Sequence, residues 1–317
     1  MESHMLAPIV LFVYNRPTHT LQTLEALANN SLAKDSILYI YVDGAKTNAN
    51  VETIKRIEET KDIIKQKQWC KEVHIIESEE NKGLANSIVE GVTDIVNKYG
   101  KIIVLEDDIV TSPGFLKYMN DALDLYENKD RVMHISGFVP VTSGADKLPE
   151  TYFLRFMSCW GWATWKKDWS ELILDTDFLY KTIPHQKDYS AFNLEGATNM
   201  FSQIEANHNG TLKTWAIKWY STIFLKKGLC LYPRYSVVDN VGIDGSGENS
   251  GNAQDLFKVS LAQSVDVKPI KIEENLYAKK YLKRFYIYGR DSSFRKRLIR
   301  SIKKTFLFKV YKKLRYQ

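Results

Sequence analysis

Cysteine is scarce in this chain, and what there is indicates neither a disulfide framework nor a zinc site. The 317 residues contain only Cys70, Cys159 and Cys230, an odd number at spacings that zinc ligands do not show. A reducing cytoplasm is therefore the expected compartment. The six histidines are scattered singly, and no pair at helical spacing suggests a metal site.

Long hydrophobic runs and several catalytic motifs are missing as well. The most apolar stretch, residues 8–14, has the length of a strand and falls short of the roughly 18 apolar residues that a membrane span needs. The protein is therefore not expected to be integral to a membrane. No Gly-x-Ser-x-Gly sequence and no glycine-rich phosphate loop follows a predicted strand, so hydrolase, P-loop and dinucleotide-binding functions lack their motifs.

Charge is unevenly distributed along the chain. The net charge is +6, but residues 279–317 contain 15 Lys and Arg against one acidic residue, which is +14 and leaves −8 for the rest. With 44% hydrophobic and 26% charged residues, the whole chain has the composition of a globular protein with a sizeable core. The body and the basic tail therefore need separate explanations.

Short apolar runs alternate with helical patterns over the first 140 residues. The runs lie at residues 9–14, 37–42, 73–76 and 102–105. Because they are apolar on both faces, they predict strands buried between helical layers in an α/β fold with a largely parallel sheet. Ligands of such sheets bind beyond the carboxyl ends of the strands.

The alternation of apolar runs and helical patterns weakens after about residue 150, where aromatic residues concentrate. We expect an α/β half over residues 6–150 and a mixed half over 151–278 that together form one continuous domain, followed by the basic tail over 279–317. The periodicity in the second half predicts a helix over 212–226 and a short strand over 229–232. The names N-terminal half and C-terminal half refer to the first two of these parts.

Three carboxylates in a row, Glu106, Asp107 and Asp108, follow the fourth apolar run. Their mutual repulsion costs electrostatic energy unless a cation offsets it. Such oxygen ligands suit Mg²⁺ or Mn²⁺, which take one or two carboxylates plus phosphate oxygens, and the ion would stabilise a diphosphate leaving group. The alternative is an acidic turn that caps the following helix.

Polar residues also follow the first two runs. Arg16 could pair with a diphosphate or a base, and Asp43 could accept a hydrogen bond from a base N–H. The alternatives are a surface ion pair for Arg16 and a type I turn built on Asp43-Gly44, and each is favoured when the residue is taken alone.

Tryptophans gather at the start of the C-terminal half, where Gly161 would let a ligand approach the backbone closely. Their aromatic faces could stack on a sugar, although a place in the core is the usual fate of such residues. The same alternatives apply to Trp215 and Trp219, which four-residue spacing puts on one helix face. The first group consists of Trp160, Trp162, Trp165 and Trp169.

Taken together, these residues resemble the GT-A glycosyltransferases, and most closely the family of N-acetylglucosaminyltransferase I and its bacterial relatives in surface-polysaccharide synthesis. The resemblance covers roughly residues 8–250, and the order and spacing of the motifs carry it. The matching stretches are residues 13–18, 41–44, 81–84, 104–108, 112–115, 160–162 and 239–247.

The resemblance implies a Rossmann-like sheet flanked by helices and a metal-dependent donor site. By it, Asp108 is the metal ligand for Mn²⁺ or Mg²⁺, Asp107 binds the ribose, and Glu106 contacts the nucleotide. Asp43 is expected to bind the uracil, and Arg16 the base or the diphosphate. The implied donor is a UDP-sugar, with UDP-N-acetylglucosamine as the first candidate.

Further roles follow from the same resemblance. Lys82 is expected on the nucleotide side, and Trp160 and Gly161 near the transferred sugar and the acceptor. Trp215 is a further substrate candidate, on the aromatic-stacking argument given above. The implied acceptor is a glycan or a lipid-linked sugar in bacterial surface-polysaccharide synthesis.

One departure concerns the catalytic base. The eukaryotic family places an Asp directly after a tryptophan of the later helix, and this chain has Ala216 there. An inverting displacement needs a base within reach of the acceptor hydroxyl. Asp244 is the preferred candidate because glycines flank it, Glu248 is the other, and a turn role for Asp244 is an equal alternative. A retaining reaction needs no such base, so the stereochemistry stays open.

The basic tail repeats an apolar residue at every fourth position over residues 294–314, with Lys and Arg between. This pattern predicts a C-terminal amphipathic helix that lies on an anionic membrane surface, which would make the enzyme cytoplasmic and peripheral to the membrane. The apolar stripe favours lipid over nucleic acid, and a helix packed on the protein's own core is the remaining alternative.

Two other functions compete with glycosyl transfer. A sugar nucleotidyltransferase would share the sheet and the acidic turn, but it would carry a glycine-rich loop after the first strand. A non-catalytic carbohydrate-binding protein stays possible because Ala216 cannot accept a proton.

Overall fold

One eight-stranded sheet runs through the computed structural model, which describes residues 5–140, 144–244 and 257–289. Four neighbouring strands of the N-terminal half are parallel, and β8 then pairs antiparallel with both of its neighbours. The strand order is β3 (Glu72–Glu77), β2 (Ile37–Val42), β1 (Ile9–Val13), β4 (Lys101–Glu106), β8 (Trp162–Trp165), β6 (Val132–Ser136), β9 (Leu229–Pro233) and β7 (Thr151–Leu154). The predicted α/β fold with a mostly parallel sheet is confirmed in the N-terminal half, and the same sheet continues into the C-terminal half.

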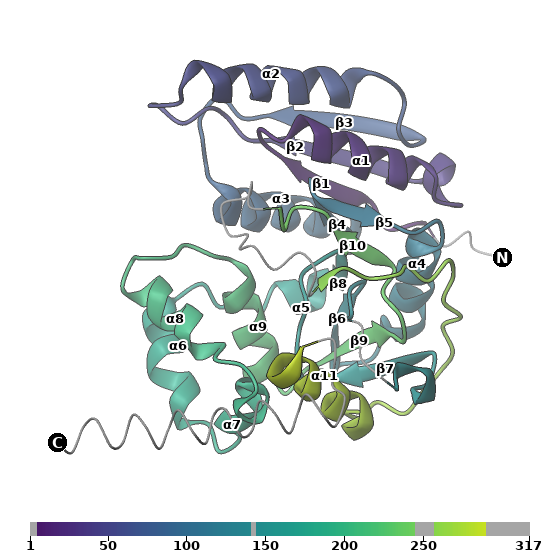
Figure 1. Cartoon of the computed structure of the whole chain (residues 1–317), viewed down its shortest axis with the longest axis vertical. Helices are drawn as coiled ribbons and strands as arrows, with labels where there is room; N and C mark the ends of the chain where they lie inside the picture. Colours follow the sequence, from purple (N-terminus) through teal and green to yellow (C-terminus); the bar gives the residue numbers. More distant parts are fainter. Residues whose placement is uncertain (1–4, 141–143, 245–256, 290–317) are drawn as a thin grey trace.

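Helices cover both faces of the parallel strands (Figure 1). Alternate residues of β1 enter different cores, since Leu11 packs in the cluster that contains residues of α1 and α2, and Phe12 packs in the one that contains residues of α3. A strand buried on both faces is apolar throughout, as the sequence indicated. The helices of this half are α1 (Pro17–Ala28), α2 (Val51–Lys65), α3 (Leu84–Tyr99) and α4 (Phe115–Tyr126), with a short 3₁₀ turn at Ala33–Asp35.

Local sequence signals set where these helices begin and end. Pro17 stands in the first turn of α1, where its missing N–H costs nothing. The Asn50 side chain caps α2 by accepting from the Thr53 N–H at 2.8 Å. Gly100 ends α3 in the left-handed conformation, with φ of 80°. These helix ends fix the strand-to-helix turns that carry the polar residues.

The C-terminal half adds a group of short helices and a small two-stranded ribbon. The ribbon pairs β5 (Ile109–Thr111), directly after the acidic turn, with β10 (Val238–Asn240), and so joins the two halves. The predicted helix begins at Ala216, four residues later than expected. The helices are α5 (Lys166–Trp169), α6 (Thr176–Thr182), α7 (Tyr189–Phe192), α8 (Phe201–His208), α9 (Ala216–Leu225) and α11 (Leu276–Tyr288), with 3₁₀ turns at Ala145–Lys147, Ile183–His185 and Leu194–Gly196.

Helix α11 begins just before the basic tail and packs against β7 and the C-terminal core. Ion pairs to Glu195 hold it, with Lys279 at 2.7 Å and Lys283 at 2.9 Å. The amphipathic helix predicted over residues 294–314 lies outside the described residues. None of the helices in the described part of the chain is long and apolar enough to span a membrane.

Candidate active site

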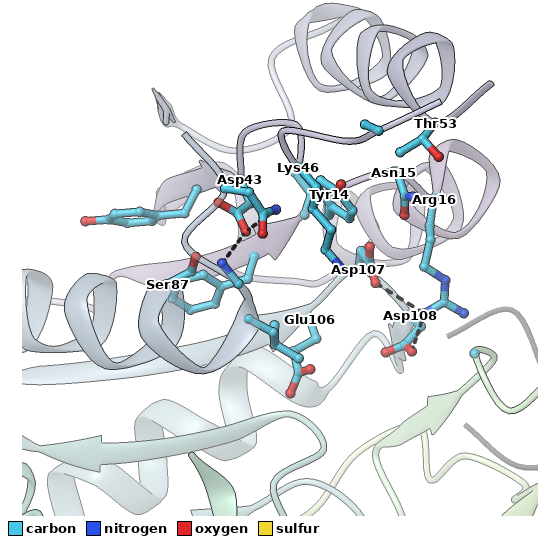
Figure 2. A pocket seen from close by; sticks show the side chains of 18 of the residues that line it. Tyr14, Asn15, Arg16, Asp43, Lys46, Thr53, Ser87, Glu106, Asp107 and Asp108 are labelled. Atoms are coloured by element: carbon cyan, nitrogen blue, oxygen red, sulfur yellow. Dashed lines mark hydrogen bonds and ion pairs between the residues drawn. The ribbon is translucent and has the colours of Figure 1, made fainter. Parts of the chain in front are cut away.

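A cavity of about 630 Å³ opens at the carboxyl ends of β1, β2 and β4, in the size range of pockets that hold drug-sized ligands. Because these strands are neighbours in the sheet, the polar residues that follow them meet along one edge. Arg16, Asp43 and the acidic turn all line the cavity. Figure 2 shows Asp43 at one side of the cavity, Arg16 with Asp108 at the other, and Glu106 between them.

Arg16 is the counter-charge of the acidic turn. Its Nη1 lies 2.7 Å from Asp108 Oδ2 and 3.4 Å from Asp107 Oδ1. The turn is fixed from behind, where the Thr23 hydroxyl of α1 donates to the Asp107 carbonyl at 2.9 Å. The structure thus brings together the residues that the sequence predicted for a donor and metal site.

The cluster holds more negative charge than Arg16 can balance. Burial, together with the neighbouring Asp108 charge, raises the pKa of Glu106 to about 8 and that of Asp107 to about 7. Part of each side chain still faces the cavity, so a ligand can reach both. Burial works to lower the pKa of Arg16, but Asp107 and Asp108 outweigh it and raise that pKa.

A segment of the C-terminal half closes over the acidic turn. The Val241 N–H donates to the Asp108 carbonyl at 3.0 Å, directly after β10. Gly242 lies so close that a Cβ there would stand 2.0 Å from Asp108 Oδ2. This segment brings Asp244 to the site, where its carboxylate lies 3.1 Å from His19 Nε2 and 3.8 Å from Arg16 Nη2.

Asp43 is engaged by the loop that precedes α3. Its Oδ1 accepts from the N–H groups of Gly44 at 3.0 Å and Lys82 at 2.8 Å. Its Oδ2 accepts from Asn81 Nδ2 at 3.1 Å and from the Gly83 N–H at 2.9 Å. Four bonds fill the acceptor positions of one carboxylate, so Asp43 fixes the shape of this end of the cavity.

The other predicted residues fall in different places. Trp160 lines the cavity beside Phe257, at 5.6 Å between ring centroids. Gly161 is buried with φ of 56°, and its missing side chain makes room for Val238 rather than for a ligand in the cavity. The Lys82 side chain points outward to a surface carboxylate. Trp215 is 4% exposed and belongs to the core.

Several cavity residues were not predicted from the sequence. Tyr14 has a buried hydroxyl with no hydrogen-bond partner among the described residues, so a bound ligand could supply one. Tyr14 ends the first apolar run, and this position could have indicated from the sequence that its side chain reaches the cavity. Lys46, Thr53 and Ser87 stand on loops or helix starts and had no such signal. They also line the cavity.

The mostly parallel sheet, with a polar cavity at the carboxyl ends of its strands, is the arrangement of a GT-A fold. Residues 9–162, just under half of the chain, match the family described as glycosyl transferase family 2, and this part contains the acidic turn, Arg16 and Asp43. This part of the chain is similar to glycosyl transferase family 2 domains, and the mostly parallel sheet flanked by helices agrees with a GT-A fold. The narrower resemblance to the N-acetylglucosaminyltransferase I family stays a prediction.

Solved structures with a similar fold share little sequence with this chain. Staphylococcus aureus TarS is 12% identical over 41% of this chain and 21% of its own, with a TM-score of 0.29. Mannosyltransferase PcManGT from Pyrobaculum calidifontis, in complex with GDP-Man and Mn²⁺, is 10% identical over 70% of this chain and 68% of its own, with a TM-score of 0.36. A UDP-glucose pyrophosphorylase complexed with UDP-glucose is 14% identical over 53% and 79%, with a TM-score of 0.33.

The chain thus spans about a fifth of the length of TarS. A comparison with curated proteins gave no match.

Proposed function

We propose that this enzyme transfers a sugar from a UDP-sugar, with UDP-N-acetylglucosamine as the first candidate, and that a divalent cation assists it. The observation that carries the proposal is the acidic turn Glu106–Asp107–Asp108, which faces a cavity of about 630 Å³ beside Arg16 and Asp43. Diphosphate needs positive charge, and a nucleotide needs polar groups at a distance from it. Arg16 and a bound cation would supply that charge beside Asp108, and Asp43 with its loop lies at the other side of the cavity (Figure 2).

The residues present fit Mg²⁺ or Mn²⁺ bound together with a nucleotide. Among the described residues, no group of three His, Cys, Asp or Glu side chains is arranged to hold a metal ion alone. Mg²⁺ in nucleotide sites usually takes one or two carboxylates and completes its shell with phosphate oxygens and water. Asp108 would be the main protein ligand. The ion, when bound, supplies charge that stabilises the departing diphosphate.

Arg16 and Asp107 would contact the donor beside this ion. The Arg16 guanidinium pairs with Asp108 at 2.7 Å, and its fork geometry suits a diphosphate oxygen. Asp107 would accept hydrogen bonds from the ribose hydroxyls. The unpartnered Tyr14 hydroxyl is a further contact for the donor, because a buried hydroxyl without a partner costs free energy until a ligand supplies one.

The uracil would lie at the Asp43 side of the cavity. The Asp43 carboxylate already accepts four bonds from the protein, and so it would act on the base mainly by fixing the loop around Asn81 and Gly83. Both of these residues line the cavity, and the Asn81 amide is held in place by Asp43 and by the Gly44 carbonyl.

Asp244 is our candidate for the catalytic base of an inverting reaction. The acceptor hydroxyl would attack the anomeric carbon, the bond to the diphosphate would break, and the hydroxyl proton would pass to Asp244. Contacts to His19 and Arg16 hold this carboxylate beside the donor site. Trp160 would stack on the transferred sugar or the acceptor, because its ring lines the cavity at moderate exposure.

The acceptor would be a glycan or a lipid-linked sugar of bacterial surface-polysaccharide synthesis, handled at the cytoplasmic face of the membrane. The support is sequence-based, since the apolar and basic pattern of residues 294–314 suits an anionic surface. If a variant that ends at Gly289 sediments with anionic liposomes as fully as the whole chain, the tail is not the anchor.

A donor screen tests the proposed function. We expect UDP release from one UDP-sugar in the presence of Mn²⁺ and a suitable acceptor, and at least a tenfold lower rate when the metal is chelated. Release of GDP from a GDP-sugar alone would contradict the UDP assignment, and an unchanged rate in chelator would contradict the metal assignment.

A further inference from the structure

A second hollow, of about 290 Å³, lies between the two halves of the molecule. Its wall comes from the start of α3, the loop before α6 and the start of α9. The polar groups in this wall are Asn86, Glu90, Lys213, Thr214 and Lys218. We call it the lysine hollow.

Two positive charges face this hollow, those of the exposed Lys213 and the half-buried Lys218. Neither Lys213 nor Lys218 forms an ion pair or a hydrogen bond through its ammonium group to another described residue. Glu90, the one carboxylate of the wall, is already taken by Lys82 at 2.6 Å.

Keeping the two ammonium groups together has an electrostatic cost. Burial, and then the charge of Lys213, lower the pKa of Lys218, while the charge of Asp175 acts in the opposite direction. Two like charges around a partly desolvated hollow repel one another, and a bound anion would convert this repulsion into attraction. Lysine is a common ligand of phosphate groups for this reason.

The start of α9 also favours a bound anion in the hollow. The cap residue Trp215 offers no side-chain acceptor to the first N–H groups of the helix, and it lines the hollow with Thr214. The positive end of the helix dipole therefore adds to the two lysines. The Thr214 hydroxyl and the Asn86 amide are neutral hydrogen-bond donors in the same wall.

The hollow and the donor cavity share one wall. Leu84 and Ser87 of the first turn of α3 line the donor cavity, and their neighbours Ala85 and Asn86 line the lysine hollow. A helix with its side chains is about 10 Å wide, which is the order of one or two sugar rings. A molecule with a hydroxyl at the donor cavity could therefore place a charged group in the hollow.

We propose that the lysine hollow binds a phosphate or diphosphate group of the sugar acceptor, through Lys213 and Lys218. The inference rests on the proposed function, because only a sugar-transfer reaction has a sugar acceptor. It adds to that function a substrate class, a phosphate-bearing acceptor. The phosphate could belong to a lipid-linked diphosphate or to a phosphorylated glycan.

Calorimetry with inorganic pyrophosphate tests the site. The whole protein is titrated with UDP and Mn²⁺ already saturating the donor cavity, and we expect binding that weakens at least tenfold in the double variant Lys213→Gln/Lys218→Gln. The matched control Lys34→Gln/Lys187→Gln removes two exposed charges elsewhere and should stay within twofold of wild type. Equal pyrophosphate affinity in the two double variants would overturn the proposal.

Two further measurements separate the outcomes. UDP affinity of Lys213→Gln/Lys218→Gln should stay within twofold of wild type, and its melting temperature checks that the variant is folded. If neither wild type nor the variants bind UDP, the proposed function fails, while the difference in pyrophosphate affinity between the two double variants still reports on the hollow. A short isoprenyl diphosphate and a sugar 1-phosphate are then tested as competitors of pyrophosphate. The competitor that displaces pyrophosphate identifies which kind of phosphate group the hollow binds. If neither competitor displaces it, the acceptor role is overturned.

Discussion

The two halves of the molecule differ in where their most conspicuous side chains lie. In the N-terminal half, charged side chains that follow the strands turn into the donor cavity, as Arg16 and Asp108 do. In the C-terminal half, the most conspicuous side chains are tryptophans, and Trp162 and Trp215 stack at 5.1 Å inside the core. Position relative to the strand ends, more than residue type, decides which side chains reach the cavity.

The largest effect is expected from the tryptophan core. Trp162 is fully buried between Trp215 and His134, so Trp162→Ala should lower the free energy of unfolding by about 3–5 kcal/mol. Trp160→Ala is the matched variant at the cavity wall and should cost clearly less. Urea unfolding measures both, and equal losses would remove the distinction between a core and a cavity tryptophan.

The acidic turn should show the next largest effect, on binding instead of stability. Asp108→Ala removes the main carboxylate for the cation, and we expect UDP affinity in Mn²⁺ to fall about a hundredfold, or about 2.7 kcal/mol. Asp121→Ala, which removes a helix-surface carboxylate paired with Lys117, is the control. Calorimetry decides, and unchanged UDP affinity in Asp108→Ala would contradict the metal assignment.

Much of the N-terminal half could be predicted from the sequence because one physical rule governs it. Strands buried on both faces are apolar throughout, so β1, β2 and β4 were found within a residue or two of their ends. The parallel arrangement then put Arg16, Asp43 and the acidic turn at one edge.

The C-terminal half escaped prediction for physical reasons. Strand β8 coincides with the tryptophan motif, whose residues gave no alternating pattern, and β6 and β7 pair with partners far along the chain. Which tryptophan faces a ligand depends on such long-range packing, and so Trp215 was placed on the sugar side while the structure buries it in the core. Three of the four bonds to Asp43 likewise come from a loop some 40 residues away.

A substitution at Gly242, in the segment after β10, should have an intermediate effect on UDP binding. A side chain at Gly242 would collide with Asp108 Oδ2, so Gly242→Val should displace the acidic turn and weaken UDP binding about tenfold. Gly210→Ala is the control, because nothing lies within 4 Å of the added carbon, and its positive φ costs only about 1 kcal/mol of stability. If Gly242→Val binds UDP as wild type does, the contact between β10 and the acidic turn has no part in donor binding.

The smallest effect concerns the attachment of α11. Hydrogen bonds and ion pairs from Lys279 and Lys283 lower the pKa of Glu195 to about 2, from an ordinary value near 4.5. A lowered carboxyl pKa adds stability above pH 4.5 that is lost as the pH falls toward 2. Because the Glu195 side chain is 44% exposed, Glu195→Gln should cost less than about 1 kcal/mol at pH 7.

Urea unfolding of Glu195→Gln and wild type between pH 7 and pH 3 follows this loss, with Glu79→Gln as an exposed control. The difference between Glu195→Gln and wild type should shrink as the pH falls. If the difference in free energy of unfolding stays constant, the ion pairs of Glu195 are not its cause.

The central claim is that the acidic turn and a nucleotide diphosphate bind one divalent cation together, and electron paramagnetic resonance of free Mn²⁺ tests it most directly. We expect the wild-type protein to remove little free Mn²⁺ by itself and to remove about one equivalent once UDP is added, beyond what UDP binds alone. Asp108→Ala should lose this additional uptake. Additional uptake of the same size in Asp108→Ala, or none in wild type, would contradict the account.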